Sequence, residues 1–439
     1  MSEEVESKIE NWVPPTPEVP EYWEIPDFDS LIDSISTNGI KIPQKSYLKE
    51  GSFPIVDQGQ GLIGGFTDDE SKVLRNSGEV VVFGDHTRCF KLINFDFAPG
   101  ADGVKILKPG NNLDCRFIYY ALTALKLPNR GYSRHYSFLR KSKIPLPPLN
   151  EQKRIVEKIE ELFSEIDKGV ESLKTAREQL NLYRQAILKH AFEGKLTADW
   201  REGFQISPDS WGIVRVKDVA VVGTGATPKR GQKKYYENGT HPWITSGALN
   251  SEFVTEHSEL ITDAALKETN CKLYKPGTIL VAMYGEGKTR GKSAVLKIEA
   301  ATNQACAAIT IKSENVLRDY LWSYFKYNYE NIRLQSSGGV QPNLNLTHIK
   351  NIRVPLPSLA EQRVIVEEVD RQISKVKKTQ MEIDLSLLRL NKLRQSILKK
   401  AFSGKLVAQD PNDEPASVLL DRIQTEKEKN SKKKKGKAA

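Results

Sequence analysis

A long internal repeat constrains the fold of this chain more than any other feature of its sequence. Residues 144–196 align without a gap to residues 354–406, with 23 identities in 53 positions. Each copy opens with Pro-Leu-Pro, which interrupts the preceding element, and each closes at a glycine, Gly194 or Gly404. We therefore expect two copies of one long helix, each preceded by its own globular segment.

Both copies carry capping signals at the start of the expected helix. Asn150 is a candidate N-cap in the first copy, and Ser358 with Glu361 forms a candidate capping box in the second. Some forty residues at 1.5 Å per residue give each helix a length of about 60 Å. Such an element is a spacer rather than a catalytic core.

Apolar residues recur every seven positions along both copies, which is the period of a coiled-coil seam. The expected interface residues are Ile159, Ile166, Leu173, Leu180 and Ile187 in the first copy and Val369, Val376, Ile383, Leu390 and Ile397 in the second. A second row is Ile155, Leu162, Gly169, Ala176 and Tyr183 in the first copy, and the weaker Ile365, Gln372, Thr379, Ser386 and Leu393 in the second. We predict that the helices pair as an antiparallel coiled coil with pseudo-twofold symmetry. The alternative is two amphipathic helices packed in separate domains.

The segments before the two helices share one order of elements, with strands first, then a helix, then a basic loop. Both predict a mixed α/β (α+β) fold. In the first segment we expect strands at 80–83 and 103–107 and a helix at 113–125; in the second, strands at 278–283 and 294–298, an apolar stretch at 305–311 and a helix at 316–329. The resulting domains are an acidic N-terminal arm (1–24), a first globular domain (25–143), the central repeat helix (144–196), a linker (197–209), a second globular domain (210–353), the C-terminal repeat helix (354–406) and a basic tail (407–439). We expect the arm and the tail to be mobile or only locally docked.

The distribution of charge favours a polyanionic partner. The formal net charge is +9, but residues 427–437 alone contribute seven lysines against one glutamate. Residues 1–84 sum to −10, whereas 85–150 sum to +7 and 204–354 to +6. Basic regions are thus separated from acidic ones, as in proteins with a nucleic-acid-binding face.

Composition argues against export and against a membrane protein. No apolar run approaches the length of a bilayer span, and the first six residues lack the pattern of a signal peptide. Cys89, Cys115, Cys271 and Cys306 are far apart and form no CxxC pair, which argues against a zinc site or a disulfide framework. We expect a soluble protein of the reducing cytoplasm, with no metal site.

Residues 282–289 (AMYGEGKT) resemble a phosphate-binding loop after a strand. Such a loop needs a following helix, whose N-terminal amides hold the phosphates. Here Arg290 and Gly291 interrupt, and residues 294–298 read as a returning strand. We therefore expect a basic hairpin that contacts nucleic acid, the alternative being a merely solvated loop.

Several loops combine cations with aromatic or amide side chains, which suits contacts to DNA phosphates and base edges. They lie before each helix and within the second domain. The candidate DNA-binding residues are Arg88, Arg130, Tyr132, Arg134, His135, Tyr136, Lys229, Arg230, Lys233, Lys234, Tyr235, Lys288, Thr289, Arg290, Lys292, Ser336, Gln341, Asn343 and Asn345.

Catalytic motifs are missing from the sequence. There is no HExxH, no Asn-Pro-Pro-aromatic tetrapeptide and no glycine-rich loop suited to a methyl-donor cofactor. This favours a binding protein without catalytic residues.

The repeated signatures resemble the specificity (S) subunits of type I restriction-modification systems, over nearly the whole chain. They are PLPPLNEQ at 145–152, LKHAFEGKL at 188–196, PLPSLAEQ at 355–362 and LKKAFSGKL at 398–406, with IVDQGQ at 55–60, IGGF at 63–66, TRGK at 289–292 and TNQ at 302–304.

The resemblance implies a non-catalytic subunit whose two recognition domains each bind half of a split, asymmetric sequence in double-stranded DNA. It implies that the helices fix the separation of these domains and dock modification (methyltransferase) subunits, two of them by expectation. It further implies that S-adenosylmethionine, ATP and Mg²⁺ belong to those partners and to restriction (translocase/nuclease) subunits, with no cofactor in this chain. Two alternatives remain: a DNA-modifying enzyme with its own nuclease or methylase activity, and a structural coiled-coil adaptor.

Overall fold

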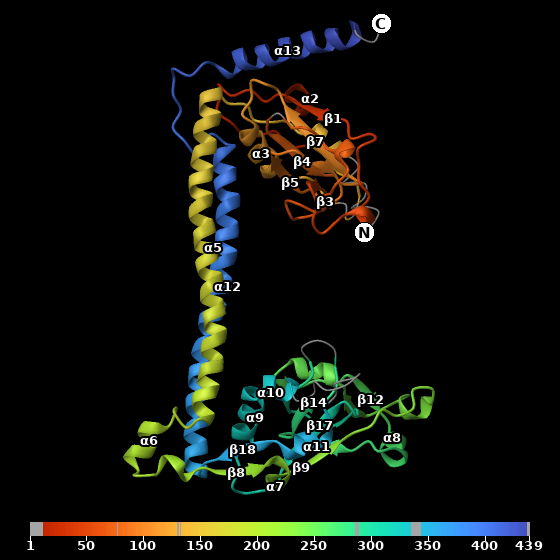
Figure 1. Ribbon diagram of the computed structural model, residues 1–439, viewed down its shortest axis with the longest axis vertical. Coiled ribbons are helices and arrows are strands. Elements are labelled where there is room, and N and C mark those ends of the chain that lie inside the picture. Colours follow the sequence, from red (N-terminus) through yellow and green to blue (C-terminus); the bar gives the residue numbers. More distant parts are fainter. Residues whose placement is uncertain are drawn as a thin grey trace. The chain divides into compact units, whose positions relative to one another are not determined.

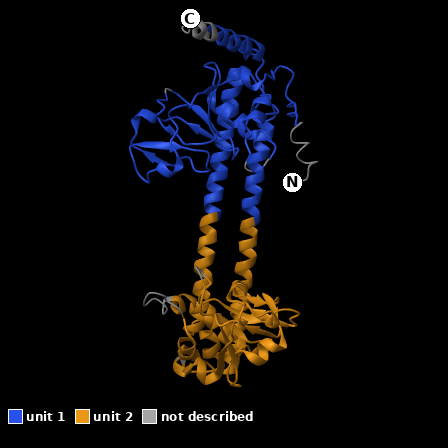
Figure 2. Ribbon diagram, turned by 90° about the vertical axis from the view of Figure 1, so that its right-hand side faces the viewer, with its two compact units in different colours: residues 1–173, 385–439 blue, residues 174–384 orange. Residues whose placement is uncertain are grey.

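The computed structural model describes residues 12–76, 78–129, 131, 133–285, 289–334 and 344–436. The chain divides into two compact units (Figure 2). Unit 1 consists of Met1–Leu173 with Leu385–Ala439, and unit 2 of Lys174–Asp384. Each unit thus contains one globular domain together with part of each long helix. Among the described residues, no helix is both long and apolar enough to cross a membrane.

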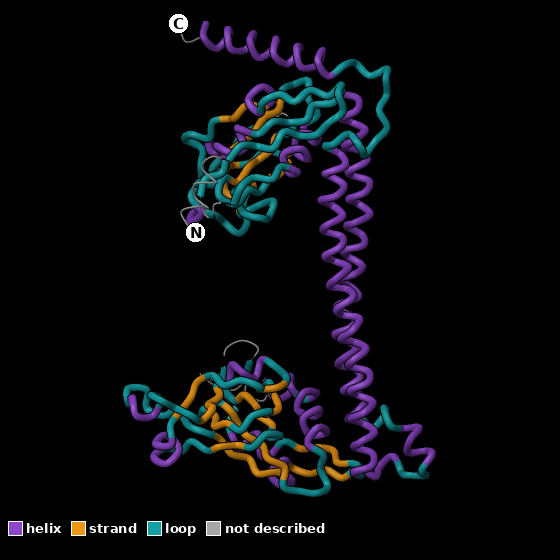
Figure 3. Tube along the Cα trace, turned by 180° about the vertical axis from the view of Figure 1, so that it is seen from behind, coloured by secondary structure: helices purple, strands orange, loops and turns teal. Residues whose placement is uncertain are grey.

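The globular domain of unit 1 is built on two small sheets (Figure 3). One sheet has the order β1-β7-β4-β5 and the other the order β3-β2-β6. Its strands are β1 (Ile32–Ile35), β2 (Phe53–Val56), β3 (Gly65–Thr67), β4 (Val80–Gly84), β5 (Phe90–Ile93), β6 (Ala98–Pro99) and β7 (Val104–Pro109). Its helices are α2 (Phe28–Leu31), α3 (Cys115–Ala124), α4 (Tyr136–Lys141) and α13 (Ala416–Gly436), with 3-10 turns at Gln44–Ser46 and Glu70–Lys72.

The globular domain of unit 2 contains the sheets β11-β15-β14-β17-β9, β12-β10-β16-β13 and β18-β8. Its strands are β8 (Gly212–Arg215), β9 (Ala220–Thr224), β10 (His241–Ile244), β11 (Phe253–Val254), β12 (Glu259–Ile261), β13 (Leu273–Tyr274), β14 (Ile279–Ala282), β15 (Ser293–Leu296), β16 (Ala300–Thr302), β17 (Cys306–Ile311) and β18 (Arg353–Leu356). Its helices are α6 (Ala198–Gly203), α7 (Val216–Val219), α8 (Asp263–Glu268), α9 (Arg318–Tyr327), α10 (Tyr329–Leu334) and α11 (Leu346–Asn351), with 3-10 turns at Pro208–Ser210, Lys233–Tyr235 and Ser246–Asn250.

The two globular domains share one topology. The order β1-β7-β4-β5 in unit 1 corresponds to β9-β17-β14-β15 in unit 2. Parallel pairing of β2 with β6 corresponds to parallel pairing of β10 with β16, and the partners β3 and β12 are antiparallel in both units. The predicted mixed α/β fold and the shared order of elements are therefore confirmed.

The central strands are uniformly apolar because both of their faces are buried. In β4, Val81 and Phe83 pack in the core that contains α3, whereas Val80 and Val82 pack in a second cluster. In β14 the same alternation divides two clusters between its odd and even residues. A strand covered on both sides shows a continuous apolar run rather than polar alternation.

The segment that resembles a phosphate-binding loop is part of a hairpin. β14 pairs antiparallel with β15, so the chain returns as a strand. This confirms the expected hairpin, and among the described residues from 289 to 296 the chain forms a turn and a strand rather than the helix whose amides would hold phosphates.

The two long helices are α5 (Leu149–Phe192) and α12 (Leu359–Ala401). In unit 1, the first part of α5 runs antiparallel to the last part of α12, where Arg394 pairs with Asp167. In unit 2, the last part of α5 lies against the first part of α12, where the Tyr183 hydroxyl donates to Gln372 Oε1 at 3.3 Å. The predicted antiparallel coiled coil is confirmed (Figure 2).

Seven of the ten predicted interface residues are buried, and the other three are partly buried. The buried set is Ile159, Ile166, Ile187, Val369, Val376, Ile383 and Ile397; the partly buried set is Leu173, Leu180 and Leu390. The second row is less regular, because Tyr183 and Leu393 are about half exposed.

The ends of the long helices follow the sequence signals except at two start signals: Asn150, and the Glu361 half of the predicted capping box, since the Glu361 carboxylate binds Thr197 and Trp211 instead. Gly194 and Gly404 both adopt positive φ, +75° and +66°, in the left-handed conformation that ends a helix. Ser358 Oγ accepts a hydrogen bond from the Glu361 amide at 3.2 Å, as a cap should. Asn150 is not the N-cap, because α5 already begins at Leu149.

Candidate nucleic-acid interface

Two predicted DNA-contacting segments of unit 1 meet at the end of β4. Asp85 follows this strand, and its Oδ1 accepts hydrogen bonds from the amides of His135 and Tyr136, both at 2.7 Å. Asp85 thereby caps the first turn of α4 and ties the preceding loop to the β4–β5 turn. Arg88, in that turn, and the exposed Arg134, directly before α4, therefore belong to one end of the domain.

Unit 2 has the corresponding attachment. The Leu344 amide donates to the Met283 carbonyl at 3.2 Å, so the segment before α11 is fixed to the end of β14. Asn345 Oδ1 accepts from the His348 amide at 2.9 Å and caps α11. The end of the central strand and the start of the short helix lie together in both units.

The hairpin turns of both units contain a left-handed residue at the corresponding place. Arg88 has φ +61° and Gly291 has φ +84°. This region is uncommon for a residue with a side chain, and such strained positions concentrate at functional sites. The Arg88 guanidinium donates to the Leu127 carbonyl at 3.4 Å and remains partly exposed.

A polar cluster forms at the β14–β15 hairpin. Lys292 Nζ donates to Asn250 Oδ1 at 2.8 Å, and the Thr289 hydroxyl donates to the same oxygen at 3.4 Å. Arg290 is partly exposed beside them. Predicted residues of the hairpin thus converge on an amide that the sequence did not single out.

Two of the candidates are buried. His135 is completely buried, and its ring Nδ1 lies 2.9 Å from the Asp85 carbonyl oxygen. Tyr235 is 8% exposed, and its hydroxyl donates to Glu268 at 3.1 Å. In the structure, both side chains hold their loops in place. Tyr136 is half-buried and packs edge-on against Phe28.

Two cations of the basic stretch 229–235 pair with acidic residues that lie far away in the sequence. Arg230 pairs with Glu259, and Lys234 pairs with Glu268. Arg230 also lies over the rings of Tyr236 and Trp243. Exposed ion pairs of this kind are weak and can exchange for phosphates, but the stretch does not carry four uncompensated cations. Lys233 pairs with Glu237, and Lys229 is exposed.

Six candidates lie outside the described residues. They are Arg130, Tyr132, Lys288, Ser336, Gln341 and Asn343.

Sequence reasoning missed one supporting loop in unit 1, residues 57–64. The Thr87 hydroxyl donates to the Gln58 carbonyl at 2.6 Å, so the loop contacts the β4–β5 turn and holds it in place. Leu62 and Ile63, in the same loop, are exposed although large and apolar. The signals available were the IVDQGQ and IGGF segments at 55–60 and 63–66, which were noted for the resemblance but not as part of the interface.

A buried carboxylate joins each globular domain to its long helix. The Trp23 indole donates to Glu151 Oε2 at 3.1 Å, and the Trp211 indole donates to Glu361 Oε2 at 2.9 Å. Both glutamates belong to the Glu-Gln pairs of the repeat, and both are 1% exposed. We call the contacts of Glu151 and Gln152 the first junction, and those of Glu361 and Gln362 the second junction.

The glutamines of both junctions bind main-chain atoms at the start of a domain helix. Gln152 Oε1 accepts from the Asp114 amide at 3.3 Å, where α3 begins. Gln362 Oε1 accepts from the Leu317 amide at 2.8 Å, where α9 begins. Each glutamine Nε2 also donates to a proline carbonyl of the Pro-Leu-Pro segment at 2.9 Å. The repeated Glu-Gln pair therefore orients a domain on its helix.

The two junctions differ in charge. Glu361 pairs with the buried Arg201 and accepts from the Thr197 hydroxyl at 2.7 Å. Glu151 instead accepts from the hydroxyl of Tyr22, and burial raises the pKa of its carboxyl. The neighbouring ion pair of the first junction joins Arg154 to Asp413 at 2.6 Å.

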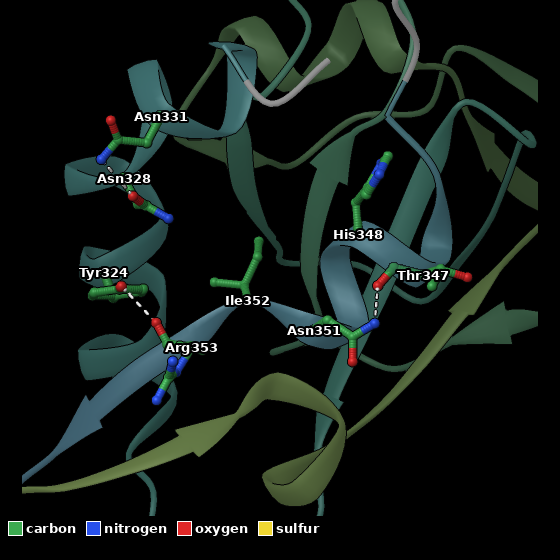
Figure 4. A pocket seen from close by; sticks show the side chains of 8 residues that line it. All are labelled: Tyr324, Asn328, Asn331, Thr347, His348, Asn351, Ile352 and Arg353. Carbon is green, nitrogen blue, oxygen red and sulfur yellow. Dashed lines mark hydrogen bonds between the residues drawn. The ribbon is translucent and has the colours of Figure 1, made fainter. Parts of the chain in front are cut away.

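Unit 2 contains a polar cleft of about 680 Å³ beside α9 and α11 (Figure 4). Its lining is Tyr324, Asn328, Asn331, Thr347, His348, Asn351, Ile352 and Arg353. The Tyr324 hydroxyl donates to the Arg353 carbonyl at 2.6 Å, and Asn331 Nδ2 donates to Asn328 Oδ1 at 3.0 Å. The first bond links α9 to β18, the second links α10 to the end of α9, and the lining supplies no carboxylate for acid–base chemistry. Within the described ranges, no three His, Cys, Asp or Glu side chains form a group suited to a metal ion.

These features define a class: a duplicated α/β domain with basic loops, each copy mounted on an antiparallel helix pair through a repeated Glu-Gln junction. The family model for the type I restriction modification DNA specificity domain matches residues 20–174 and 208–384. The specificity subunit of the type I restriction enzyme EcoR124I/EcoR124II from Escherichia coli is 25% identical over 75% of this chain and 81% of its own length. The EcoBI specificity subunit from Escherichia coli is 28% identical over 71% of this chain and 72% of its own length.

One solved structure supports the same fold. A chain from a study of complex assembly and conformational transition of the type I R-M system superimposes with a TM-score of 0.66 at 20% identity, covering 88% of this chain and 99% of the other. The chain belongs to the type I restriction-modification DNA specificity family, and its role is DNA sequence recognition.

Proposed function

We propose that each specificity domain reads one half of a bipartite, asymmetric site in the major groove of double-stranded DNA. The observation that carries the proposal is the pair of matching hairpin-and-loop surfaces, Arg88 with Arg134 in unit 1 and Thr289 to Lys292 in unit 2. The two surfaces share a backbone frame but differ in side chains, so they suit two different half-sites. Arginine, lysine and amide side chains are the usual partners of base edges and phosphates.

The paired helices set the distance between the half-sites in this proposal. At 1.5 Å per residue, the 44 residues of α5 extend over about 66 Å. Successive major-groove contacts on one face of DNA are separated by about 34 Å, so a helix of this length is long enough to carry two domains to such positions. The two junctions would keep each domain at a fixed orientation on the paired helices.

The partners in this proposal are modification subunits, two of them, and restriction subunits. Exposed apolar side chains on the long helices offer a surface for the modification subunits, since groups of large exposed apolar side chains mark sites of protein–protein contact. They are Leu182 and Tyr183 on α5, and Met381, Leu385, Leu388 and Leu393 on α12. The chain itself is non-catalytic and binds no cofactor, whereas the partners hold S-adenosylmethionine, ATP and Mg²⁺. The complex acts in the cytoplasm, where the four cysteines remain thiols.

The test is to map methylated bases in DNA treated with the chain and its modification subunits. The expected result is one split sequence, of which exchange of residues 25–143 changes one half and exchange of residues 210–353 changes the other. A methylation pattern that ignores both exchanges would overturn the proposal. Modification of DNA by the purified chain alone would support the enzyme alternative, and equal affinity for all sequences would support the structural adaptor.

A further inference from the structure

The C-terminal helix α13 is an addition to the specificity domains. It begins at Ala416, beyond the second matched range, which ends at residue 384. Its first half is docked on the globular domain of unit 1, because Ala416, Leu419 and Ile423 are buried. Leu419 and Ile423 belong to the core that contains α3 and β4. Figure 1 shows α13 near α2. The basic tail is therefore docked on the domain over this part of its length, in line with the expectation of local docking.

Electrostatic contacts place the middle of α13 next to α2 and β1. Lys427 Nζ donates to the Asp29 carbonyl of α2 at 2.8 Å and pairs with Asp33 of β1 at 3.0 Å. The carboxylate of Asp29 also pairs with Arg140 of α4. Asp29 therefore links α13 to α4, the helix that Arg134 precedes in the chain.

The remaining part of α13 is strongly basic. After Glu428 the helix contains Lys429 and Lys432–Lys435 and no acidic residue before it ends at Gly436. These lysines belong to the same helix whose first half is docked on unit 1. Clustered lysines bind DNA phosphates by releasing counterions, without regard to sequence.

We propose that α13 binds backbone phosphates of DNA that flanks the half-site read by unit 1. This inference rests on the proposed function, since it needs DNA bound to unit 1. The helix adds affinity that depends on flanking DNA and salt but does not change the sequence that is read. Phosphate contacts fix position on the duplex, and base contacts specify sequence.

The experiment uses the full chain with its modification subunits and duplexes that contain the mapped site. The flank is lengthened from about 2 to about 15 base pairs on one side at a time. The charge variant carries Lys432→Gln, Lys433→Gln, Lys434→Gln and Lys435→Gln, and its matched control carries arginine at the same four positions. Dissociation constants are measured between about 50 and 200 mM salt.

We expect the wild type and the arginine control to gain affinity when one flank, and not the other, is lengthened. The glutamine variant should lose that gain, about tenfold at about 50 mM salt, and the slope of log K against log salt should fall by roughly 0.9 for each phosphate that is no longer neutralised. The ratio of affinities for the mapped site and a site altered in one half should stay unchanged. Equal flank and salt dependence in wild type and glutamine variant would overturn the inference.

A second variant separates docking from charge. Leu419→Ala with Ile423→Ala weakens the anchor and keeps every lysine. If α13 acts as a docked helix, the affinity that this variant gains from a longer flank should no longer be confined to one side of the site. A gain confined to one flank as in the wild type would overturn the docked geometry. A wild type without preference for its mapped site would instead contradict the proposed function.

Discussion

The indole of Trp211 donates to Glu361 at 2.9 Å, and this contact repeats that of Trp23 with Glu151. The two tryptophans are 188 residues apart, whereas the two glutamates are 210 residues apart. The geometry is therefore conserved within the chain although the intervening domains differ in length. What distinguishes the junctions is the buried Arg201, which pairs with Glu361 and not with Glu151.

Neutralising the two glutamates should have unequal effects. Glu361→Gln leaves Arg201 buried without its anion, which costs about 3–5 kcal/mol of unfolding free energy. Glu151→Gln is its matched control, because burial already disfavours the charge there, and it should cost about 1 kcal/mol or less. Urea unfolding of both variants measures the difference. Equal losses would show that Arg201 is not stabilised by Glu361.

Removing a junction glutamine should loosen the start of the domain helix that it holds. Gln362→Ala leaves the Leu317 amide without its acceptor, at a cost of about 1–3 kcal/mol. Hydrogen exchange should speed up at residues 315–318. The exposed Gln395→Ala on α12 is the control and should leave exchange there unchanged. Unchanged exchange in Gln362→Ala would contradict an orienting role for this side chain.

Acid should weaken the first junction through Asp413. The hydrogen bond from Arg154 holds the pKa of the Asp413 carboxyl below its ordinary value. An acid with a lowered pKa in the folded state stabilises the fold above its ordinary pKa, and this contribution is lost as the pH falls through the folded value. The loss of stability between about pH 5 and pH 2 should therefore be smaller in Asp413→Asn than in the wild type. Thermal unfolding of both proteins across this pH range measures the difference in stability. Equal losses of stability in the wild type and in Asp413→Asn would show that Asp413 makes no such contribution.

Arg134→Ala should weaken DNA binding without affecting the fold. Its side chain is exposed, and removal of one base or phosphate contact costs about 1–3 kcal/mol, or roughly 5- to 150-fold in affinity. Loss at one base position marks a base contact, and a uniform loss marks a phosphate contact. The control is Lys189→Ala, an exposed cation on α5. If both variants bind like the wild type, Arg134 does not belong to the interface.

Two substitutions on the helices separate stability from assembly. Ile159→Ala creates a cavity in the fully buried seam and should cost about 2–5 kcal/mol. Leu182→Ala changes a side chain that is 66% exposed, so its stability should stay within about 0.5 kcal/mol of the wild type. We expect Leu182→Ala to reduce co-purification of the modification subunits. Normal assembly would show that this part of α5 is not their docking surface.

The repeat and its seven-residue period were enough to predict the helix pair, because both signals are local and strong. Domain order followed from Pro-Leu-Pro and from apolar runs such as 80–83, which are apolar throughout because both faces of the strand are buried. Start signals were less reliable: Ser358 caps its helix, but Asn150 does not.

The candidate interface was harder to predict, because exposure and charge pairing depend on tertiary contacts. Glu237 is the nearest acidic residue to Lys234 in the sequence, yet the fold pairs Lys234 with the distant Glu268. His135 stands in a polar loop, but Asp85 draws it into the core. Neither partner is recognisable from spacing along the chain.

The glutamine contacts at the two junctions involve only backbone groups of the attached domain. Gln152 and Gln362 accept hydrogen bonds from main-chain amides and donate to main-chain carbonyls. Almost any sequence supplies these groups, the exception being proline at the position of the amide. A replacement globular domain therefore needs a tryptophan near its start and the beginning of a helix at the glutamine. The junction does not depend on the sequence that the domain reads, so exchange of the domains can change the target while the long helices stay the same.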